Sequence, residues 1–206
     1  MEQNKQRIVV KVGTSTLTHN SGALDLWSME HLVRTLADLQ GMGHEVILVS
    51  SGAIAVGTAK LGLSERPKEL RMKQAAAAVG QCRMMHIYDK FFSEYNRSMA
   101  QILLTGDDVE DPERAEHLSN TSPPCWRWGV IPVVNENDSV SSAEIETGRH
   151  KVLGDNDTLS AIVAELCRAD LLVLLSDIDG LYDADPKTHP EAKLLHQVTE
   201  LTPRSW

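Results

Sequence analysis

At 206 residues the chain is long enough for one large α/β core or two small ones, and an apolar content of 42% is ordinary for a folded globular protein. Its net charge of -9 argues against a nucleic-acid or anionic-membrane partner, because binding to phosphates needs clustered Lys and Arg. The 3 cysteines lie far apart, with neither a disulfide framework nor a zinc motif, and no apolar run approaches the roughly 18 residues of a membrane span. We therefore expect a cytoplasmic protein.

The first part of the chain alternates predicted strands with predicted helices. Residues 8–12 are predicted to form a strand, and the small-residue turn 13–16 follows it. A helix capped by Ser28 and ended by Gly41 then leads into a second strand, residues 45–49.

A second small-residue turn, residues 50–57, opens another helix, and residues 69–95 are predicted to be helical with an interruption near Gly80. The remaining predicted strands are residues 99–104, 130–134 and 171–175. Strands that alternate with helices predict an α/β fold, with a mostly parallel open sheet sandwiched between helices in an αβα arrangement.

Acidic and amide side chains follow the fourth predicted strand. Residues 130–138 read V-I-P-V-V-N-E-N-D, and residues 154–157 read G-D-N-D before a helix that Asp155 or Asn156 can cap. Ligands of open α/β sheets bind at the carboxyl ends of parallel strands, so we expect these two acidic clusters to meet at one site. Weak alternation over residues 139–153 predicts a β-hairpin between them.

Lys11 stands in an otherwise apolar strand, immediately before Gly13. Burying an ammonium group is costly unless an anion pairs with it, so Lys11 is expected to face a ligand phosphate or an internal carboxylate. The alternative is a lysine on an edge strand, exposed to water. The turn at Gly13 matches no standard phosphate-binding motif, but a similar turn at residues 50–52 could hold a phosphoryl group together with it.

Three aspartates, Asp138, Asp155 and Asp157, are too many acids to face an anionic substrate directly. They are better suited to binding an ammonium group or a metal, or to orienting a lysine that must be held in place. For Asp155 the alternative is simple helix capping, worth about 1 kcal/mol. Ser176 and Asp177 open an acidic, glycine-containing segment for which ordinary loop chemistry is a strong alternative.

Segments spread over nearly the whole chain resemble the amino-acid kinase superfamily, and within it the glutamate 5-kinase family. They are V-V-K-V-G-T-S from residue 9, V-S-S-G-A-I-A-V-G from 49, K-Q-A-A-A-A-V-G-Q from 73, Q-I-L-L-T from 101, I-P-V-V-N-E-N-D from 131, G-D-N-D-T-L-S from 154 and S-D-I-D-G-L-Y-D-A-D-P from 176. Their order and spacing make the resemblance very specific.

This resemblance implies transfer of the ATP γ-phosphoryl group to the side-chain carboxylate of L-glutamate, with Mg²⁺. The product would be γ-glutamyl phosphate, in the first step of proline biosynthesis. It also implies proline as a feedback inhibitor, and we expect a homo-oligomer. The alternative is a catalytically inactive, truncated fragment that still binds glutamate or proline.

The resemblance also assigns roles to residues, leaving the metal ligands unknown. Lys11 and Asp157 are the expected catalytic residues, with Lys11 on the phosphates and Asp157 orienting the catalytic lysines. The expected substrate-binding residues are Ser51, Asp138, Asp155 and Asn156. The expected nucleotide-binding residues are Lys11, Gly13, Ser176 and Asp177.

Two stretches depart from the family. Residues 122–128 read S-P-P-C-W-R-W where the family has a helix, and proline inside a helix costs about 3 kcal/mol or more. The chain also stops at Trp206, before a glycine-rich segment that supplies a second lysine in the family. We therefore expect an incomplete kinase domain, with residues 1–175 as the amino-acid-binding lobe and residues 176–206 as the start of the nucleotide-binding lobe. Our hypothesis for both departures, at 122–128 and 203–206, is a reading-frame slip, which sequencing the gene would test.

Overall fold

The computed structural model of the protein describes residues 5–141 and 156–199. The chain divides into two compact units, Met1–Leu175 and Ser176–Trp206. All the helices and strands named below belong to the first unit. In the second, the described residues are held by an antiparallel bridge between Tyr182 and Leu194.

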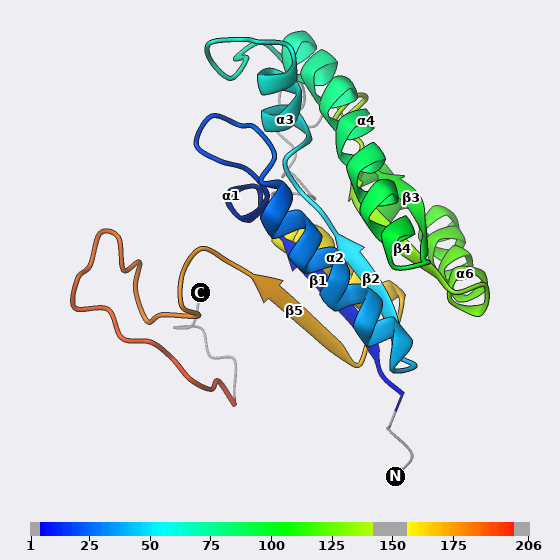
Figure 1. Cartoon of the computed structure of the whole chain (residues 1–206). Coiled ribbons are helices and arrows are strands. Elements are labelled where there is room, and N and C mark those ends of the chain that lie inside the picture. Colours follow the sequence, from blue (N-terminus) through cyan, green and yellow to red (C-terminus); the bar gives the residue numbers. More distant parts are fainter. Residues whose placement is uncertain (1–4, 142–155, 200–206) are drawn as a thin grey trace. The chain divides into compact units, whose positions relative to one another are not determined.

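The first unit contains a five-stranded sheet in the order β3-β4-β2-β1-β5, and every neighbouring pair is parallel (Figure 1). Its strands are β1 (Arg7–Val12), β2 (Glu45–Val49), β3 (Ser98–Leu104), β4 (Val130–Glu136) and β5 (Leu171–Leu175). The predicted parallel α/β sheet is confirmed. Because β1 lies between β2 and β5, the alternative that Lys11 sits on an edge strand is wrong.

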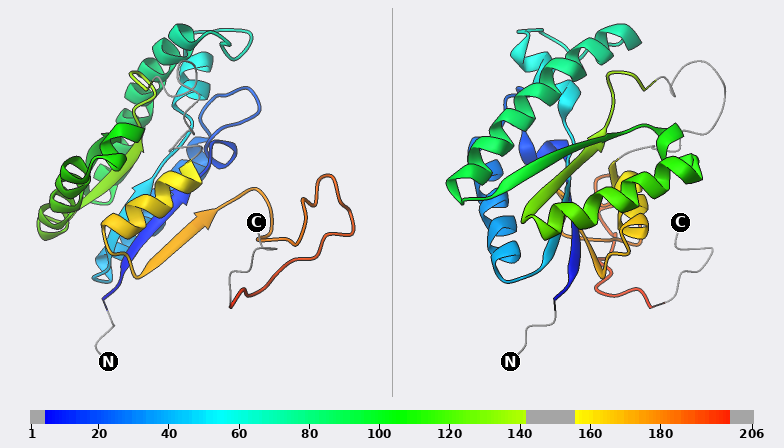
Figure 2. Two further views of the ribbon diagram at one scale, coloured as in Figure 1. Left: turned by 180° about the vertical axis from the view of Figure 1, so that it is seen from behind. Right: turned by 90° about the vertical axis from the view of Figure 1, so that its right-hand side faces the viewer.

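Helices cover both faces of this sheet, as the opposite views of Figures 1 and 2 show. The first face carries α2 (Leu26–Gly41), α3 (Ala53–Lys60) and α4 (Leu70–Glu94). The second face carries α6 (Pro112–Arg127) and α7 (Asn156–Leu166). Two short helices, α1 (Thr14–Leu17) and α5 (Gly106–Glu110), follow the ends of β1 and β3.

The side chains of β1 alternate between two apolar clusters. Ile8, Val10 and Val12 pack in the cluster formed with α2, α3 and α4, whereas Val9 packs in the cluster formed with α6 and α7. Successive side chains of a strand point to opposite faces, so Lys11 shares the face of Val9. This is the face that α7 covers.

Two details of the predicted helices are wrong. Helix α4 runs unbroken through Gly80. A glycine is needed at this position because α3 and α4 touch there: a Cβ atom would lie 1.8 Å from the carbonyl oxygen of Ala53. Helix α2 is capped by Asp25 and not by Ser28. The Asp25 side chain accepts hydrogen bonds from the backbone N–H groups of Trp27 and Ser28.

Helix α6 also overturns an expectation, since it continues through Pro123 and Pro124 to Arg127. Each proline removes one N–H donor from the helix, which favours ending it. Tertiary packing favours continuing the helix, because Ser122 and Cys125, which flank the prolines, are both buried. The predicted hairpin between the acidic clusters lies almost wholly outside the described residues.

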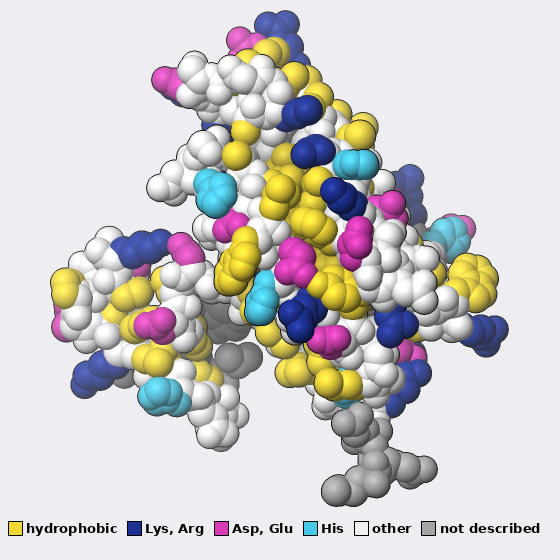
Figure 3. Space-filling view, in the orientation of Figure 1, with side chains coloured by type: hydrophobic (Ala, Val, Ile, Leu, Met, Phe, Trp, Pro, Cys, Tyr) yellow, Lys and Arg dark blue, Asp and Glu magenta, His cyan; other side chains and the backbone are white. Residues whose placement is uncertain are grey.

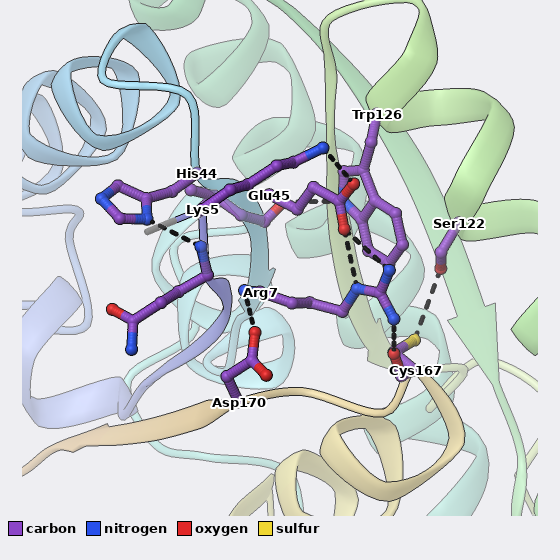
Figure 4. Close-up of polar contacts among 10 residues, drawn as sticks. Lys5, Arg7, His44, Glu45, Ser122, Trp126, Cys167 and Asp170 are labelled. Atoms are coloured by element: carbon purple, nitrogen blue, oxygen red, sulfur yellow. Dashed lines mark hydrogen bonds and ion pairs between the residues drawn. The ribbon is translucent and has the colours of Figure 1, made fainter. Parts of the chain in front are cut away.

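Arg7 joins several elements at the amino-terminal end of the sheet (Figure 4). Its Nε and Nη2 donate to Glu45 Oε2 at 2.9 and 2.7 Å, and its Nη1 donates to the carbonyl oxygen of Cys167. Its guanidinium lies 4.2 Å from the ring centroid of Trp126, and its backbone N–H donates to Asp170. One cation thus connects β1, β2, α6 and the turn between α7 and β5.

The acid partner in this network has a perturbed pKa. Burial alone would raise the pKa of Glu45, but hydrogen bonds from Lys5 and Arg7 outweigh burial and hold the pKa below its ordinary value. A carboxyl group whose pKa is lower in the folded state stabilises the protein above its unfolded-state pKa, and this stabilisation is lost as the pH falls through the folded-state value.

Acidic and basic side chains are interspersed over the face formed by α2 and α4 (Figure 3). No helix within residues 5–141 and 156–199 is long and apolar enough to cross a membrane.

We predict that Arg7→Met lowers the free energy of unfolding by about 2–3 kcal/mol at neutral pH, because it removes charge-assisted hydrogen bonds from a partly buried carboxylate. Urea denaturation measures this difference. Lys5→Met is the matched control, since Lys5 pairs with the same Glu45 but is 62% exposed, and should cost well under about 1 kcal/mol. The Arg7→Met effect should shrink as Glu45 protonates in acid; an effect independent of pH would contradict the electrostatic origin.

Candidate functional site

A cavity of about 550 Å³ lies at the carboxyl ends of β1, β2 and β4. The predicted site residues that line it are Lys11, Gly13, Ser51, Asp138, Asn156 and Asp157. Asp155 lies outside the described residues. Ser176 and Asp177 belong to the second unit, where Asp177 pairs with Lys187 at 3.5 Å.

Lys11 and Asp157 form an ion pair in this cavity, with Nζ 2.6 Å from Oδ1. The lysine side chain is 14% exposed, whereas the aspartate is 52% exposed. Asp157 lies in the first turn of α7, where the unpaired N–H groups favour a negative charge. The partly buried ammonium group is therefore neutralised by a carboxylate that solvent and ligands can still reach.

Asn156, beside this pair, is held by a cluster of oxygen atoms. Its Nδ2 donates to the carbonyl oxygen of Ser50 (2.5 Å), to Ser51 Oγ (2.6 Å) and to Asn135 Oδ1 (3.1 Å). The carbonyl of Ser50 can only accept, so the Asn156 amide cannot turn over without placing oxygen against oxygen. Within the described part of the chain, the Asn156 Oδ1 receives no hydrogen bond and remains an acceptor at the cavity.

The start of α3 forms another wall of the cavity. Gly52 caps this helix with a left-handed φ of 103°, which favours glycine, and the next residues, Ala53, Ile54 and Ala55, line the cavity. N–H groups in the first turn of a helix have no partner within the helix and attract anions. The Ser51 hydroxyl, whose oxygen accepts from Asn156, can also donate its hydrogen to an oxygen of a ligand.

Sequence reasoning missed several lining residues. Arg66, from the loop between α3 and α4, lines the cavity together with Lys73, Glu136 and Ser141. Lys73 and Glu136 lie inside segments of the family resemblance, which could have marked them. Arg66 lies outside those segments, and only the fold brings its loop to the cavity.

The charged groups of the cavity suit a ligand that carries both signs of charge. Its cations are Lys11, Arg66 and Lys73, and its acids are Glu136, Asp138 and Asp157. Over the described ranges, no three His, Cys, Asp or Glu side chains are grouped so as to hold a metal ion. Mg²⁺ does not require such a cage, since it is usually held by one or two carboxylates together with phosphates of a bound ligand.

Comparison with known proteins defines the class. The amino acid kinase family matches residues 6–205. The glutamate 5-kinase of Clostridium perfringens is 52% identical over 98% of this chain and 74% of its own length. Those of Caldanaerobacter subterraneus and Symbiobacterium thermophilum are 54% and 56% identical, over 95% and 90% of this chain.

The chain therefore belongs to the amino acid kinase family, among its glutamate 5-kinases. It spans 51% of the length of the Caldanaerobacter relative and 68% of the Symbiobacterium relative.

We predict that Asn156→Asp lowers the free energy of unfolding by about 1–3 kcal/mol, because it either places a carboxylate oxygen against the carbonyl of Ser50 or turns an oxygen away unpaired. Asn137→Asp is the matched control. The Oδ1 of Asn137 accepts from Ser139 Oγ at 2.6 Å, which an aspartate does equally well. Equal stability losses in the two variants, measured by chemical denaturation, would show that the amide of Asn156 is not held as described.

Proposed function

We propose that the protein phosphorylates the side-chain carboxylate of L-glutamate with ATP, giving γ-glutamyl phosphate in the first step of proline biosynthesis. The observation that carries this proposal is the Lys11–Asp157 ion pair at 2.6 Å, in the same cavity as Ser51, Asp138 and Asn156. The similarity to curated glutamate 5-kinases supports the choice of substrate.

The chemistry of L-glutamate fits this cavity. Its ammonium group suits Asp138 and the Oδ1 of Asn156, while its α-carboxylate suits Ser51, the start of α3, and the cations Arg66 and Lys73. The side-chain carboxylate is then left for the end of the cavity that contains Lys11. A dicarboxylic amino acid thereby places the reacting oxygen beside the ammonium group that favours phosphoryl transfer.

Both reactants of this step are anions, so catalysis consists of holding them in line and neutralising charge. Lys11 contributes a positive charge, and Asp157 holds the lysine side chain in place through the ion pair. We propose Gly13, Ser176 and Asp177 as contacts of ATP, whose γ-phosphoryl group is transferred with Mg²⁺ neutralising the phosphates. Residues 1–175 then serve as the amino-acid-binding lobe, and residues 176–206 as the start of the nucleotide-binding lobe. Asp155 is proposed to join the amino-acid site.

Feedback inhibition by proline and homo-oligomerisation are part of the same proposal. Proline carries the ammonium and α-carboxylate of glutamate without its side-chain carboxylate. It is therefore expected to occupy the amino-acid end of the cavity and to compete with glutamate in calorimetric titration.

We predict that Asp138→Ala weakens L-glutamate binding by about 1.5–3 kcal/mol, because one charge-assisted contact to the substrate ammonium is lost. Nucleotide binding should change little. Isothermal calorimetry with each ligand measures both. An unchanged glutamate affinity would remove Asp138 from the site.

We predict that Lys11→Ala lowers kcat more than it raises the KM for glutamate, because the charge of Lys11 is needed most as charge redistributes during transfer. ADP release with L-glutamate and MgATP measures this, in a protein extended at its C-terminus to the length of its relatives. A raised KM with unchanged kcat would instead make Lys11 a glutamate ligand.

The alternative function is an inactive fragment that binds glutamate or proline. Calorimetric binding and ADP release together distinguish it from an active kinase. Calorimetric binding of glutamate by both proteins, with ADP release only from the extended one, would support the fragment reading for this chain. Absence of glutamate binding in both would reject the proposed function.

A further inference from the structure

The buried amide of Gln81 has an unusual pattern of hydrogen bonds. Gln81 lies on α4, is 8% exposed and does not line the cavity. Its Oε1 accepts from Asn135 Nδ2 at 2.8 Å. Its own Nε2 is buried without a hydrogen-bond partner among the described residues. Among the described residues, the Gln81 amide therefore uses its oxygen for Asn135 while its NH₂ group has no hydrogen-bond partner.

This contact belongs to a chain of amides that leads to the cavity. Asn135 is 2% exposed, and its Oδ1 accepts from the backbone N–H of Glu136 (2.9 Å) and from Asn156 Nδ2 (3.1 Å). A backbone N–H can only donate, so Asn135 must direct its Nδ2 to Gln81. Gln81 in turn must present its oxygen, because the reverse orientation would set two donors against each other.

We propose that Gln81 is a positioning residue for the amino-acid substrate, which it never touches: it holds Asn135 so that Asn156 presents its Oδ1 to the substrate ammonium. This inference rests on the proposed function. Without an acceptor at position 81, the buried Nδ2 of Asn135 is unsatisfied, and the Asn135 side chain must turn to find another partner. Asn156 then loses one of the oxygens that fix the direction of its amide.

The test compares two ligands that differ only in the ammonium group. L-glutamate carries it and glutarate does not, so the ratio of their dissociation constants reports recognition of the ammonium. In the unmodified chain we expect glutamate to bind more tightly. In Gln81→Met, which keeps the side-chain length and removes the acceptor, this preference should fall by up to about tenfold, the worth of one charge-assisted contact.

Tyr88→Phe is the matched control. Tyr88 lies two helical turns further along α4, is fully buried, and its hydroxyl is 2.9 Å from Ser50 Oγ. Its loss removes one buried hydrogen bond between α4 and the Ser50 side chain, and it removes no donor or acceptor of the amide chain. We expect lower thermal stability in this variant with an unchanged preference for glutamate over glutarate.

Two further variants sharpen the result. Gln81→Glu keeps an acceptor oxygen and should retain most of the preference. Gln81→Asn withdraws the amide by one carbon. If Gln81→Met does not fold, Gln81→Asn is expected to show the same loss of preference for glutamate over glutarate. An unaltered preference in Gln81→Met, or an equal loss in Tyr88→Phe, would overturn the inference while leaving the proposed function standing. No glutamate binding by either the unmodified chain or the C-terminally extended protein would overturn both.

Discussion

The ammonium group of Lys11 comes from an interior strand of a parallel sheet, and the site is built around the need to neutralise it. β1 has neighbours on both sides, and the lysine side chain, which faces the cavity, is only 14% exposed. An unpaired charge there would be costly, and Asp157 at the start of α7 supplies the counter-charge. The position of α7 is therefore supported by electrostatics as well as by the packing of its own Leu159 and Val163 in the second apolar cluster.

The sequence predicted the sheet well because its signals are local. Each strand is a short apolar run ended by small or polar residues, and the structure agrees with the predicted positions to within two residues. The errors arose where long-range contacts overrule local preference. Gly80 was read as a helix breaker, yet it lies within α4 and allows the close approach of α3. The prolines of α6 were read as ending a helix, yet the helix continues through them and the residues beside them are buried.

The candidate site was predicted in its composition but not in its orientation. Acids and amides at strand ends could be gathered from the order of the strands, because parallel strands bring their carboxyl ends together. Which atom of each amide faces the ligand depends on backbone groups far away in sequence, such as the Ser50 carbonyl 106 residues from Asn156. Arg66 was missed for a similar reason, since its loop reaches the cavity only through the fold.

The two cations of β1 illustrate how the same kind of ion pair can serve stability at one end of a strand and, in the proposed function, catalysis at the other. Arg7 pairs with Glu45, which is 18% exposed and is also bound by Lys5, so the pair is enclosed by its own protein partners. Lys11 pairs with Asp157, which is 52% exposed and faces a cavity. Solvent screens this second pair, and a ligand anion can share the lysine without unfolding anything around it. A pair that can exchange partners is what phosphoryl transfer needs, because the positive charge must follow the phosphate oxygens as negative charge moves between them.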